Sequence, residues 1–229
     1  MVLTGAGVSA ESGVDTFRTK GGLWEGYDHR EVATPEGFAA DPYKVHAFYD
    51  LRRAMLPRVQ PNPAHRALAA LEARLEAAGG RLTLVTQNVD DLHERAGSRR
   101  VLHVHGELAK AECTACGAVE RWTGPMGTAA TCPACGRTGT MRPHVVWFGE
   151  MPRYLDEAEA ALRGADLFVS LGTSGSVYPA AGMVHAARAA GVRTMELNLE
   201  PSENADAFDE ARYGPATEIV PRWAEELTW

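Results

Sequence analysis

The sequence predicts an α/β fold in which helices cover both faces of a mostly parallel sheet. Short apolar stretches of strand character alternate along the chain with amphipathic helical stretches, the order typical of doubly wound sheets. The first strand, Met1 to Leu3, runs directly into a glycine turn, as nucleotide-binding α/β domains begin. Several later strands end in small or polar residues, and open α/β sheets bind ligands beyond the carboxyl ends of their strands. Together these features predict a Rossmann-like domain.

Length and charge exclude several classes of protein. The 229 residues allow one large domain with a buried core and a smaller module. A formal net charge of -7 argues against general binding to nucleic acid or to an anionic membrane. The chain shows no apolar run of about 18 residues and no secretory pattern at its N-terminus. We therefore expect a cytoplasmic protein without a nucleic-acid or membrane partner.

The turn after the first strand matches the G-x-G-x-x-G/A phosphate signature. Gly5 permits the tight turn, Gly7 lets backbone approach a pyrophosphate, and a small residue takes the third position. A glycine-rich surface turn would also fit this motif alone. Ser12-Gly13 then stops any helix after about two turns, and residues 15–22 are interpreted as a mobile loop carrying an aromatic residue and two cations. Such a loop indicates chemistry on the cofactor itself.

Residues 25–61 lack an alternating strand pattern and predict a helical insertion with two proline-initiated helices. In the second helix, Tyr49 and Arg52 are three positions apart, so they lie side by side on one face. Spacing alone favours a solvated helix face on which Arg52 pairs with Asp50 or Glu11. The helix that follows, capped at Asn62-Pro63, is interpreted as scaffold.

The strand predicted over Arg81–Thr86 ends in a polar cluster, Gln87-Asn88-Val89-Asp90. At the carboxyl end of a strand, Gln87, Asn88 and Asp90 are well placed to hold a ribose or an amide. Capping of a helix over Asp91–Ala96 would explain the same residues without a ligand.

A second predicted strand, residues 101–107, contains His103 and His105 and ends at a glycine. Because side chains alternate along a strand, we expect these two histidines on the same face. A histidine near a nucleotide site is a candidate general base, since its reference pKa is about 6.5. A purely structural histidine is the ordinary alternative.

All four cysteines fall in one segment, as Cys113-Thr-Ala-Cys116 and, after fifteen intervening residues, Cys132-Pro-Ala-Cys135. This spacing matches the zinc pattern of two C-x2-C knuckles. Four thiolates leave no open coordination position, so the predicted zinc is structural. Two disulfides are the alternative, which a cytosolic protein disfavours. We predict a zinc-ribbon module over residues 109–140.

Further strands are predicted in the second half of the chain. One lies within Arg142–Glu150 and leads into a loop. The strand Asp166–Leu171 ends in Gly172-Thr173-Ser174, a turn able to approach phosphate or ribose. The strand Val192–Leu197 ends in Asn198-Leu199-Glu200, where the acid is placed for ribose hydroxyls. Helices are predicted over residues 152–163 and 179–190.

Seven features, in this order, resemble the sirtuin family and span nearly the whole chain. They are Gly5-Ala6-Gly7-Val8-Ser9, Thr86-Gln87-Asn88-Val89-Asp90, His105-Gly106, the two Cys-x-x-Cys knuckles, Phe148-Gly149-Glu150, Gly172-Thr173-Ser174 and Asn198-Leu199-Glu200. The chain departs from the family at Val14-Asp15, where many members have Ile-Pro, and this departure falls in the cofactor loop.

The resemblance implies a protein-lysine deacylase that consumes NAD as co-substrate, transfers the acyl group to ADP-ribose and releases nicotinamide. It implies a Rossmann-like NAD-binding domain over residues 1–24, 62–108 and 141–229, a helical insertion over 25–61 and the zinc-ribbon module over 109–140. One structural Zn²⁺, acyl-lysine proteins or peptides as partners, and a monomeric state are expected with it.

The resemblance also implies residue roles. His105 would be the catalytic base, with Asn88 and Asp90 in the catalytic set. The substrate would be bound by Tyr49, Arg52, Val146, Phe148, Gly149 and Glu150. NAD would be held by Gly5, Ala6, Gly7, Ser9, Glu11, Thr16, Phe17, Arg18, Trp24, Gln87, Asn88, Val89, Asp90, Gly172, Thr173, Ser174, Asn198, Leu199, Glu200 and Ala216.

The Tyr-x-x-Arg pair resembles that of sirtuins that remove acidic acyl groups. Arg52 can bind a terminal carboxylate through two parallel hydrogen bonds, and the Tyr49 hydroxyl can add a third. Ala47 is expected to leave room for a longer acyl chain. The resemblance therefore favours succinyl- and malonyl-lysine as substrates alongside acetyl-lysine.

Two other functions stay open on the residues alone. A nicotinamide-dependent oxidoreductase would need a ribose-binding acid after a second strand, and the expected position lacks one. A zinc-ribbon nucleic-acid-binding protein would need positive charge, which the acidic balance opposes. ADP-ribosyl transfer to protein is a further side reaction that the same pocket would allow.

Overall fold

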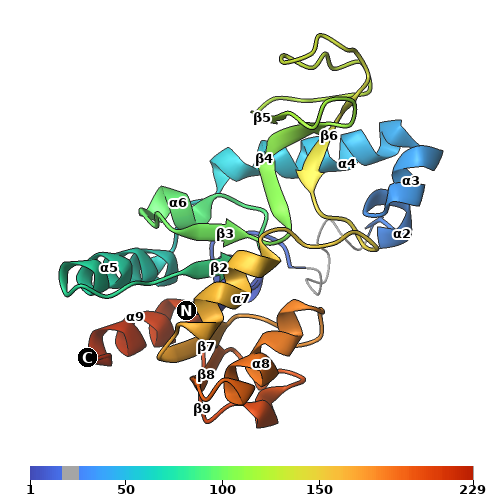
Figure 1. Ribbon diagram of the computed structural model, residues 1–229. Coiled ribbons are helices and arrows are strands. Elements are labelled where there is room, and N and C mark those ends of the chain that lie inside the picture. The colour runs from blue at the N-terminus through green and yellow to red at the C-terminus, as the bar shows by residue number, and fades with distance from the viewer. Residues whose placement is uncertain (17–25, 229) are drawn as a thin grey trace.

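The computed structural model describes residues 1–16 and 26–228 and shows a large sheet with a smaller unit beside it (Figure 1). The six strands of the large sheet are all parallel, in the order β3-β2-β1-β7-β8-β9. Their bounds are β1 (Val2–Thr4), β2 (Leu84–Thr86), β3 (Val101–His103), β7 (Leu167–Leu171), β8 (Arg193–Asn198) and β9 (Glu210–Tyr213). The order reverses beside β1, so the turns after β1 and β7 meet at the usual ligand position of such sheets.

Helices cover both faces of this sheet, and the predicted doubly wound fold is confirmed (Figure 1). Val2 packs into the core cluster that includes Leu68 and Trp223 on one face. Its neighbour Leu3 packs into the cluster of the opposite face, with Phe168. The covering helices are α5 (Pro63–Ala77) and α9 (Ala216–Glu226) on the first face, and α7 (Leu155–Arg163) and α8 (Met183–Ala189) on the second. Shorter helices are α1 (Gly7–Ala10), α6 (Leu92–Ala96) and the 3-10 turns η2 (Leu56–Arg58), η3 (Ala180–Gly182) and η4 (Ala205–Ala207).

The smaller unit is a three-stranded antiparallel sheet with a group of helices packed on it. Its strands, in the order β5-β4-β6, are β4 (Gly106–Cys113), β5 (Val119–Arg121) and β6 (Met141–Val145). The helices are α2 (His29–Val32), α3 (Pro35–Ala40) and α4 (Pro42–Met55). Phe48 and Tyr49 of α4 share one core cluster with Leu108, Val145 and Trp147. The helices therefore pack on the end of the small sheet nearest the large one, and residues around Ala111 and Met126 form a separate core cluster. The small sheet extends beyond residues 109–140 at both ends.

The prediction that His103 and His105 lie on one strand face is wrong. Strand β3 ends at His103, the chain turns, and β4 begins at Gly106 in the other sheet. Gly106 has a φ of +80°, and a Cβ added there would lie 2.1 Å from the His144 carbonyl oxygen. A side chain at this position would meet both a backbone clash and an unfavourable φ. Alternation along a strand therefore ends at His103, and His105 belongs to the turn between the two sheets.

Two elements near the C-terminus, β9 and α9, were not predicted from the sequence. Strand β9 is short and forms the edge of the sheet. Helix α9 contains Pro221 in its interior, a residue that normally argues against a helix. Among residues 1–16 and 26–228, no helix has the length and apolar character needed to cross a membrane.

We predict that Gly106→Ala destabilises the protein by more than about 1 kcal/mol, because the clash is with backbone, and removes most of the deacylation that the resemblance implies. Thermal unfolding and turnover on an acyl-lysine peptide provide the measurements. Gly124→Ala is the matched control, since a Cβ at Gly124 meets nothing within 4 Å. A normal melting temperature and normal activity of Gly106→Ala would contradict this account of the turn.

Candidate active site

The two glycine turns predicted to bind phosphate or ribose contact each other. The N–H of Gly7 donates to the carbonyl oxygen of Gly172 at 2.8 Å. A Cβ at Gly7 would lie 2.7 Å from that oxygen. Glycine is therefore required at position 7 by the contact between the two turns, and its predicted approach to pyrophosphate stays a prediction. The Asn198 amide donates to the Thr173 carbonyl at 2.8 Å, which ties the turn after β8 to the same place.

Below these turns lies a buried polar network centred on Ser9. The Asn62 N–H lies 3.3 Å from His65 Nδ1, so this nitrogen accepts and Nε2 carries the ring proton. His65 Nε2 is 3.3 Å from Ser9 Oγ, and the Asn88 amide donates to the same oxygen at 3.0 Å. Both lone pairs of the hydroxyl are then used, which leaves its proton to be donated to Asp90.

The charges of this network follow from its burial. Burial lowers the pKa of His65 to about 4, and the positive charge of Arg66 acts in the same direction. Burial raises the pKa of Asp90, opposed by hydrogen bonds from the Leu92 N–H and from Ser9. His65 is therefore neutral near pH 7, and the network holds Asn88 and Asp90 through dipoles rather than through ion pairs.

His105 has the hydrogen bonding required of a general base. Its Nδ1 lies 3.1 Å from the carbonyl oxygen of Gln87, which can only accept, so Nδ1 carries the proton and Nε2 keeps its lone pair. Burial lowers the pKa of His105, and the hydrogen bond to Gln87 opposes this shift. The carbonyl of His105 accepts from the Val146 N–H at 2.9 Å. The imidazole is thus neutral and oriented at neutral pH.

His103, by contrast, supports the framework. It is 4% exposed, with Nδ1 at 2.9 Å from the Asn88 carbonyl oxygen and Nε2 at 2.7 Å from Glu94 Oε1. Burial lowers its pKa, but the Glu94 carboxylate outweighs this effect and the net shift is upward. Both ring nitrogens have partners, so His103 is occupied in holding the backbone of Asn88.

Tyr49 and Arg52 do not form a solvated helix face. Tyr49 is 1% exposed, and its hydroxyl oxygen accepts from the Trp147 indole N–H at 2.9 Å. The Arg52 guanidinium carbon lies 5.6 Å from the centroid of the Tyr49 ring. Burial lowers the pKa of Arg52, while the Tyr49 oxygen and the Asp90 carboxylate act in the opposite direction. Arg52 is thus a half-buried cation that interacts electrostatically with the Asp90 carboxylate.

The acids considered as surface partners of Arg52 bind other groups. Asp50 pairs with Arg53 at 2.5 Å and accepts from the Met126 N–H. Glu11 accepts from the N–H and hydroxyl of Thr217 at 3.0 and 2.7 Å. Ala47, on the same helix, is exposed, and its role in leaving room for a longer acyl chain stays a prediction.

The loop after β6 holds the remaining predicted substrate residues. Phe148 is 52% exposed, and its N–H donates to the Ala33 carbonyl at 2.9 Å. Glu150, predicted at the substrate, accepts instead from Arg142 and from the Trp147 N–H. Both of its oxygens accept within the protein, so Glu150 holds the shape of the loop, and its predicted contact with substrate stays a prediction.

The four cysteine thiols converge at the far end of the small sheet. Their Sγ atoms lie within 4.8 Å of one another. The Cys113–Cys135 and Cys116–Cys132 sulfur pairs are each 3.8 Å apart. Zn–S bonds of about 2.3 Å in a tetrahedron place sulfur atoms about 3.8 Å apart. The donor set and its spacing fit one structural zinc with no position open for a substrate.

Comparison with known proteins decides the family. Residues 5–179 match the model of the Sir2 family. An NAD-dependent protein deacylase from Caulobacter vibrioides is 62% identical over 226 residues, which is 99% of this chain and 95% of that protein. The chain belongs to the Sir2 family. The resemblance to sirtuins is confirmed, and this sirtuin is an enzyme of NAD-dependent protein deacylation.

Solved sirtuin structures agree with this assignment. A Sir2 homologue in complex with NAD is 41% identical, with a TM-score of 0.88 over 98% of this chain and 87% of that one. Sir2Af2 bound to a myristoylated histone peptide is 36% identical, with a TM-score of 0.73 over 98% of this chain and 89% of that one. NAD is the co-substrate, and the four-cysteine site fits the structural zinc expected beside it.

The fold of this sirtuin brings much of the predicted NAD set to one edge of the large sheet. Thr16 is half-buried, and Leu199 and Glu200 are exposed. Glu11 binds Thr217 of α9, the neighbour of Ala216. Phe17, Arg18 and Trp24 lie outside the described residues. The remaining NAD residues surround the carboxyl ends of β1, β2, β7 and β8: Gly5, Ala6, Gly7, Ser9, Gln87, Asn88, Val89, Asp90, Gly172, Thr173, Ser174 and Asn198.

Sequence reasoning missed three residues that hold the site. His65 orients Ser9, and its only sequence signal is the Asn-Pro-Ala-His start of α5, whose capping box uses His65. Trp147 donates to the Tyr49 oxygen, and Arg142 stacks on Trp147. In the sequence they are only an aromatic residue and a cation within the segment predicted as strand and loop.

We predict that Cys116→Ser lowers the zinc content and the unfolding midpoint by roughly 5 °C or more, because structural zinc contributes folding free energy. Metal analysis and thermal unfolding of the purified protein are the measurements. Ala115→Ser places a hydroxyl in the same knuckle without removing a thiolate, and serves as the control. Well-folded protein without zinc, combined with a normal midpoint for Cys116→Ser, would refute the metal assignment.

Proposed function

We propose that the protein removes acyl groups from lysine side chains, passes them to ADP-ribose with release of nicotinamide, and favours succinyl and malonyl groups over acetyl. The observation that carries the proposal is the position of the half-buried Arg52 beside Tyr49, with its guanidinium carbon 5.6 Å from the ring centroid, where it also interacts electrostatically with Asp90. This places a cation and a hydroxyl near the residues that we assign to the nicotinamide and ribose.

His105 is assigned as the general base. Its protonated Nδ1 donates to the Gln87 carbonyl, so Nε2 is free to take a proton from a ribose hydroxyl. Such a base typically contributes about 10²- to 10⁴-fold to rate. Because burial lowers the pKa of His105, the base form is already the main form at neutral pH.

Asn88 and Asp90 are assigned to the nicotinamide and ribose side of the site. Both are buried and both are oriented by Ser9. Positive charge develops on the ribose as nicotinamide leaves, and fixed dipoles stabilise it without reorganising. When bound, NAD supplies the electrophilic sugar carbon, while the chain supplies orientation and the base.

The acyl-lysine peptide is assigned to the loop after β6. The Val146 N–H is bonded to His105, so its carbonyl oxygen is the backbone group left for a substrate N–H. Phe148 and Gly149 are exposed beside it. A myristoylated histone peptide bound to the similar Sir2Af2 supports a peptide substrate of this kind.

A terminal carboxylate is the chemical partner that Arg52 and Tyr49 fit. Guanidinium binds carboxylate through two parallel hydrogen bonds, which lysine cannot reproduce. Hydrogen bonds to charged groups contribute about 1.5 to 3 kcal/mol each, enough for a tenfold or larger preference over acetyl-lysine. A cytoplasmic location is proposed with this function, from the sequence alone.

Mass spectrometry tests the reaction directly. Purified protein with NAD and matched acetyl-, succinyl- and malonyl-lysine peptides should yield nicotinamide and the corresponding acyl-ADP-ribose in equal amounts. Loss of the acyl group without nicotinamide release would refute acyl transfer to ADP-ribose.

We predict that His105→Ala removes most turnover, about 10²-fold or more, and leaves NAD binding largely intact. In the unmodified enzyme, kcat/KM should fall as the pH drops through the pKa of His105, because protonation removes the base. Burial lowers this pKa, so the fall should be centred below about pH 6.5.

Rate profiles and NAD titrations of both proteins provide the measurement. His103→Ala is unsuitable as a control because His103 holds the Asn88 carbonyl. His185→Ala, on an exposed position of α8, replaces it. An acid limb centred above the ordinary histidine range, or substantial turnover by His105→Ala, would refute the assignment.

We predict that Arg52→Met lowers kcat/KM for succinyl-lysine by tenfold or more and changes that for acetyl-lysine little, because only the succinyl group has a carboxylate to lose its partner. Arg58→Met, an exposed change in the neighbouring turn, is the matched control. Equal efficiency of the unmodified enzyme on acetyl- and succinyl-lysine would show that Tyr49 and Arg52 do not select acidic acyl groups.

A further inference from the structure

The direction of the hydrogen bonds at Tyr49 is set by its neighbours. The Trp147 indole N–H lies 2.9 Å from the Tyr49 oxygen, and indole nitrogen is a donor only. Arg52 lies beside the same ring, with its guanidinium carbon 5.6 Å from the centroid, and a guanidinium group has only donors. Because neither neighbour can accept a hydrogen bond, the phenol can donate its own proton only to a third group.

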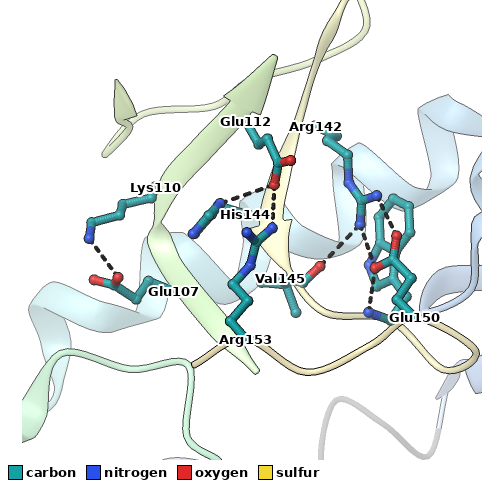
Figure 2. A network of polar contacts seen from close by, with 9 residues as sticks. Glu107, Lys110, Glu112, Arg142, His144, Val145, Glu150 and Arg153 are labelled. Carbon is teal, nitrogen blue, oxygen red and sulfur yellow. Dashed lines mark hydrogen bonds and ion pairs between the residues drawn. The ribbon is translucent and has the colours of Figure 1, made fainter. Parts of the chain in front are cut away.

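Trp147 is held on two sides by an ion pair. Arg142 stacks on the indole, with its guanidinium carbon 3.6 Å from the ring centroid. Glu150 accepts from the two terminal nitrogens of Arg142 at 2.6 and 2.9 Å (Figure 2). It also accepts from the backbone N–H of Trp147 at 2.8 Å. Arg142 also donates to the Val145 carbonyl at 3.1 Å. The stacked guanidinium therefore holds the orientation of the indole ring, and the bond to Glu150 holds the Trp147 backbone.

The ion pair keeps its charges in this half-buried setting. Burial raises the pKa of Glu150, but the hydrogen bonds from Arg142 and from the Trp147 N–H outweigh this effect and lower it. The Arg142 side chain is 15% exposed and that of Glu150 is 26% exposed. The Trp147 residue itself is 3% exposed, so its indole N–H has no bulk water as an alternative acceptor to the Tyr49 oxygen.

We propose that Trp147, clamped by the Arg142–Glu150 ion pair, is a positioning residue for acyl recognition that commits the Tyr49 hydroxyl to donate its proton to the end of the acyl group. This inference rests on the proposed preference for acidic acyl groups. A hydroxyl held as a donor favours a carboxylate over an acyl end that offers no acceptor. The acyl end is remote from the reacting carbonyl, so the contribution should fall on KM more than on kcat.

A double-mutant cycle tests the coupling. Trp147→Phe keeps an aromatic ring for Arg142 and removes only the indole N–H. We expect it to raise KM for succinyl-lysine roughly 3- to 10-fold, with kcat within about twofold and little change on acetyl-lysine. In a Tyr49→Phe background, the same change should have little further effect, because the group it orients is gone.

A second measurement does not require Trp147→Phe to fold or any substrate to bind. The indole N–H resonance of Trp147 in the unmodified protein should shift in Tyr49→Phe, which removes its acceptor. Trp122, whose indole N–H donates to the Pro125 carbonyl, provides an internal reference that should not move.

The outcomes separate this inference from the proposed function. A succinyl preference combined with a Trp147→Phe effect that persists in the Tyr49→Phe background overturns the inference alone. Absence of any succinyl preference overturns the proposed acyl specificity. In that case an indole shift in Tyr49→Phe still supports the positioning of Tyr49 by Trp147, and an unmoved resonance overturns it.

Discussion

The site depends on the backbone at Gly106, where the chain leaves the parallel sheet and enters the antiparallel one. A left-handed φ and the 2.1 Å approach of a hypothetical Cβ to the His144 carbonyl restrict this position to glycine. The turn places His105 between the two sheets, where its carbonyl binds the Val146 N–H of the returning strand. One turn thus joins the residues assigned to the base, the peptide and the edge of the large sheet.

Beneath this junction, neutral buried groups set the electrostatics. His65 and His93 lie with ring centroids 4.8 Å apart, and burial lowers the pKa of both. Two imidazolium ions at this distance would repel each other strongly, so the pair stays uncharged. His93 Nε2 lies 3.0 Å from the Thr4 hydroxyl, and His65 reaches Ser9. The carboxyl ends of β1 and β2 are therefore held by dipoles, which need no reorganisation during the reaction.

Sequence patterns predicted the strands and their ends well, because buried parallel strands are short apolar runs that stop at polar or glycine turns. The zinc site was predictable because four ligands fall within one local segment. The orientation of Tyr49 was not, because the small sheet decides which face of α4 is buried. The position of His105 was mispredicted because β3 ends at His103 and the chain turns before β4 begins at Gly106, so the two histidines do not share a strand. Long-range contacts such as Trp147 with Tyr49, 98 residues apart, leave no local pattern.

The central claim is that His105 is a neutral imidazole whose Nδ1 proton is held by Gln87 and whose Nε2 is free. Long-range ¹H–¹⁵N correlation spectra of the imidazole side chains measure this directly, with His105→Gln used to assign the resonance. Near pH 7 we expect a protonated Nδ1 and an unprotonated Nε2 for His105. An imidazolium at that pH, or a tautomer with its proton on Nε2, would contradict it.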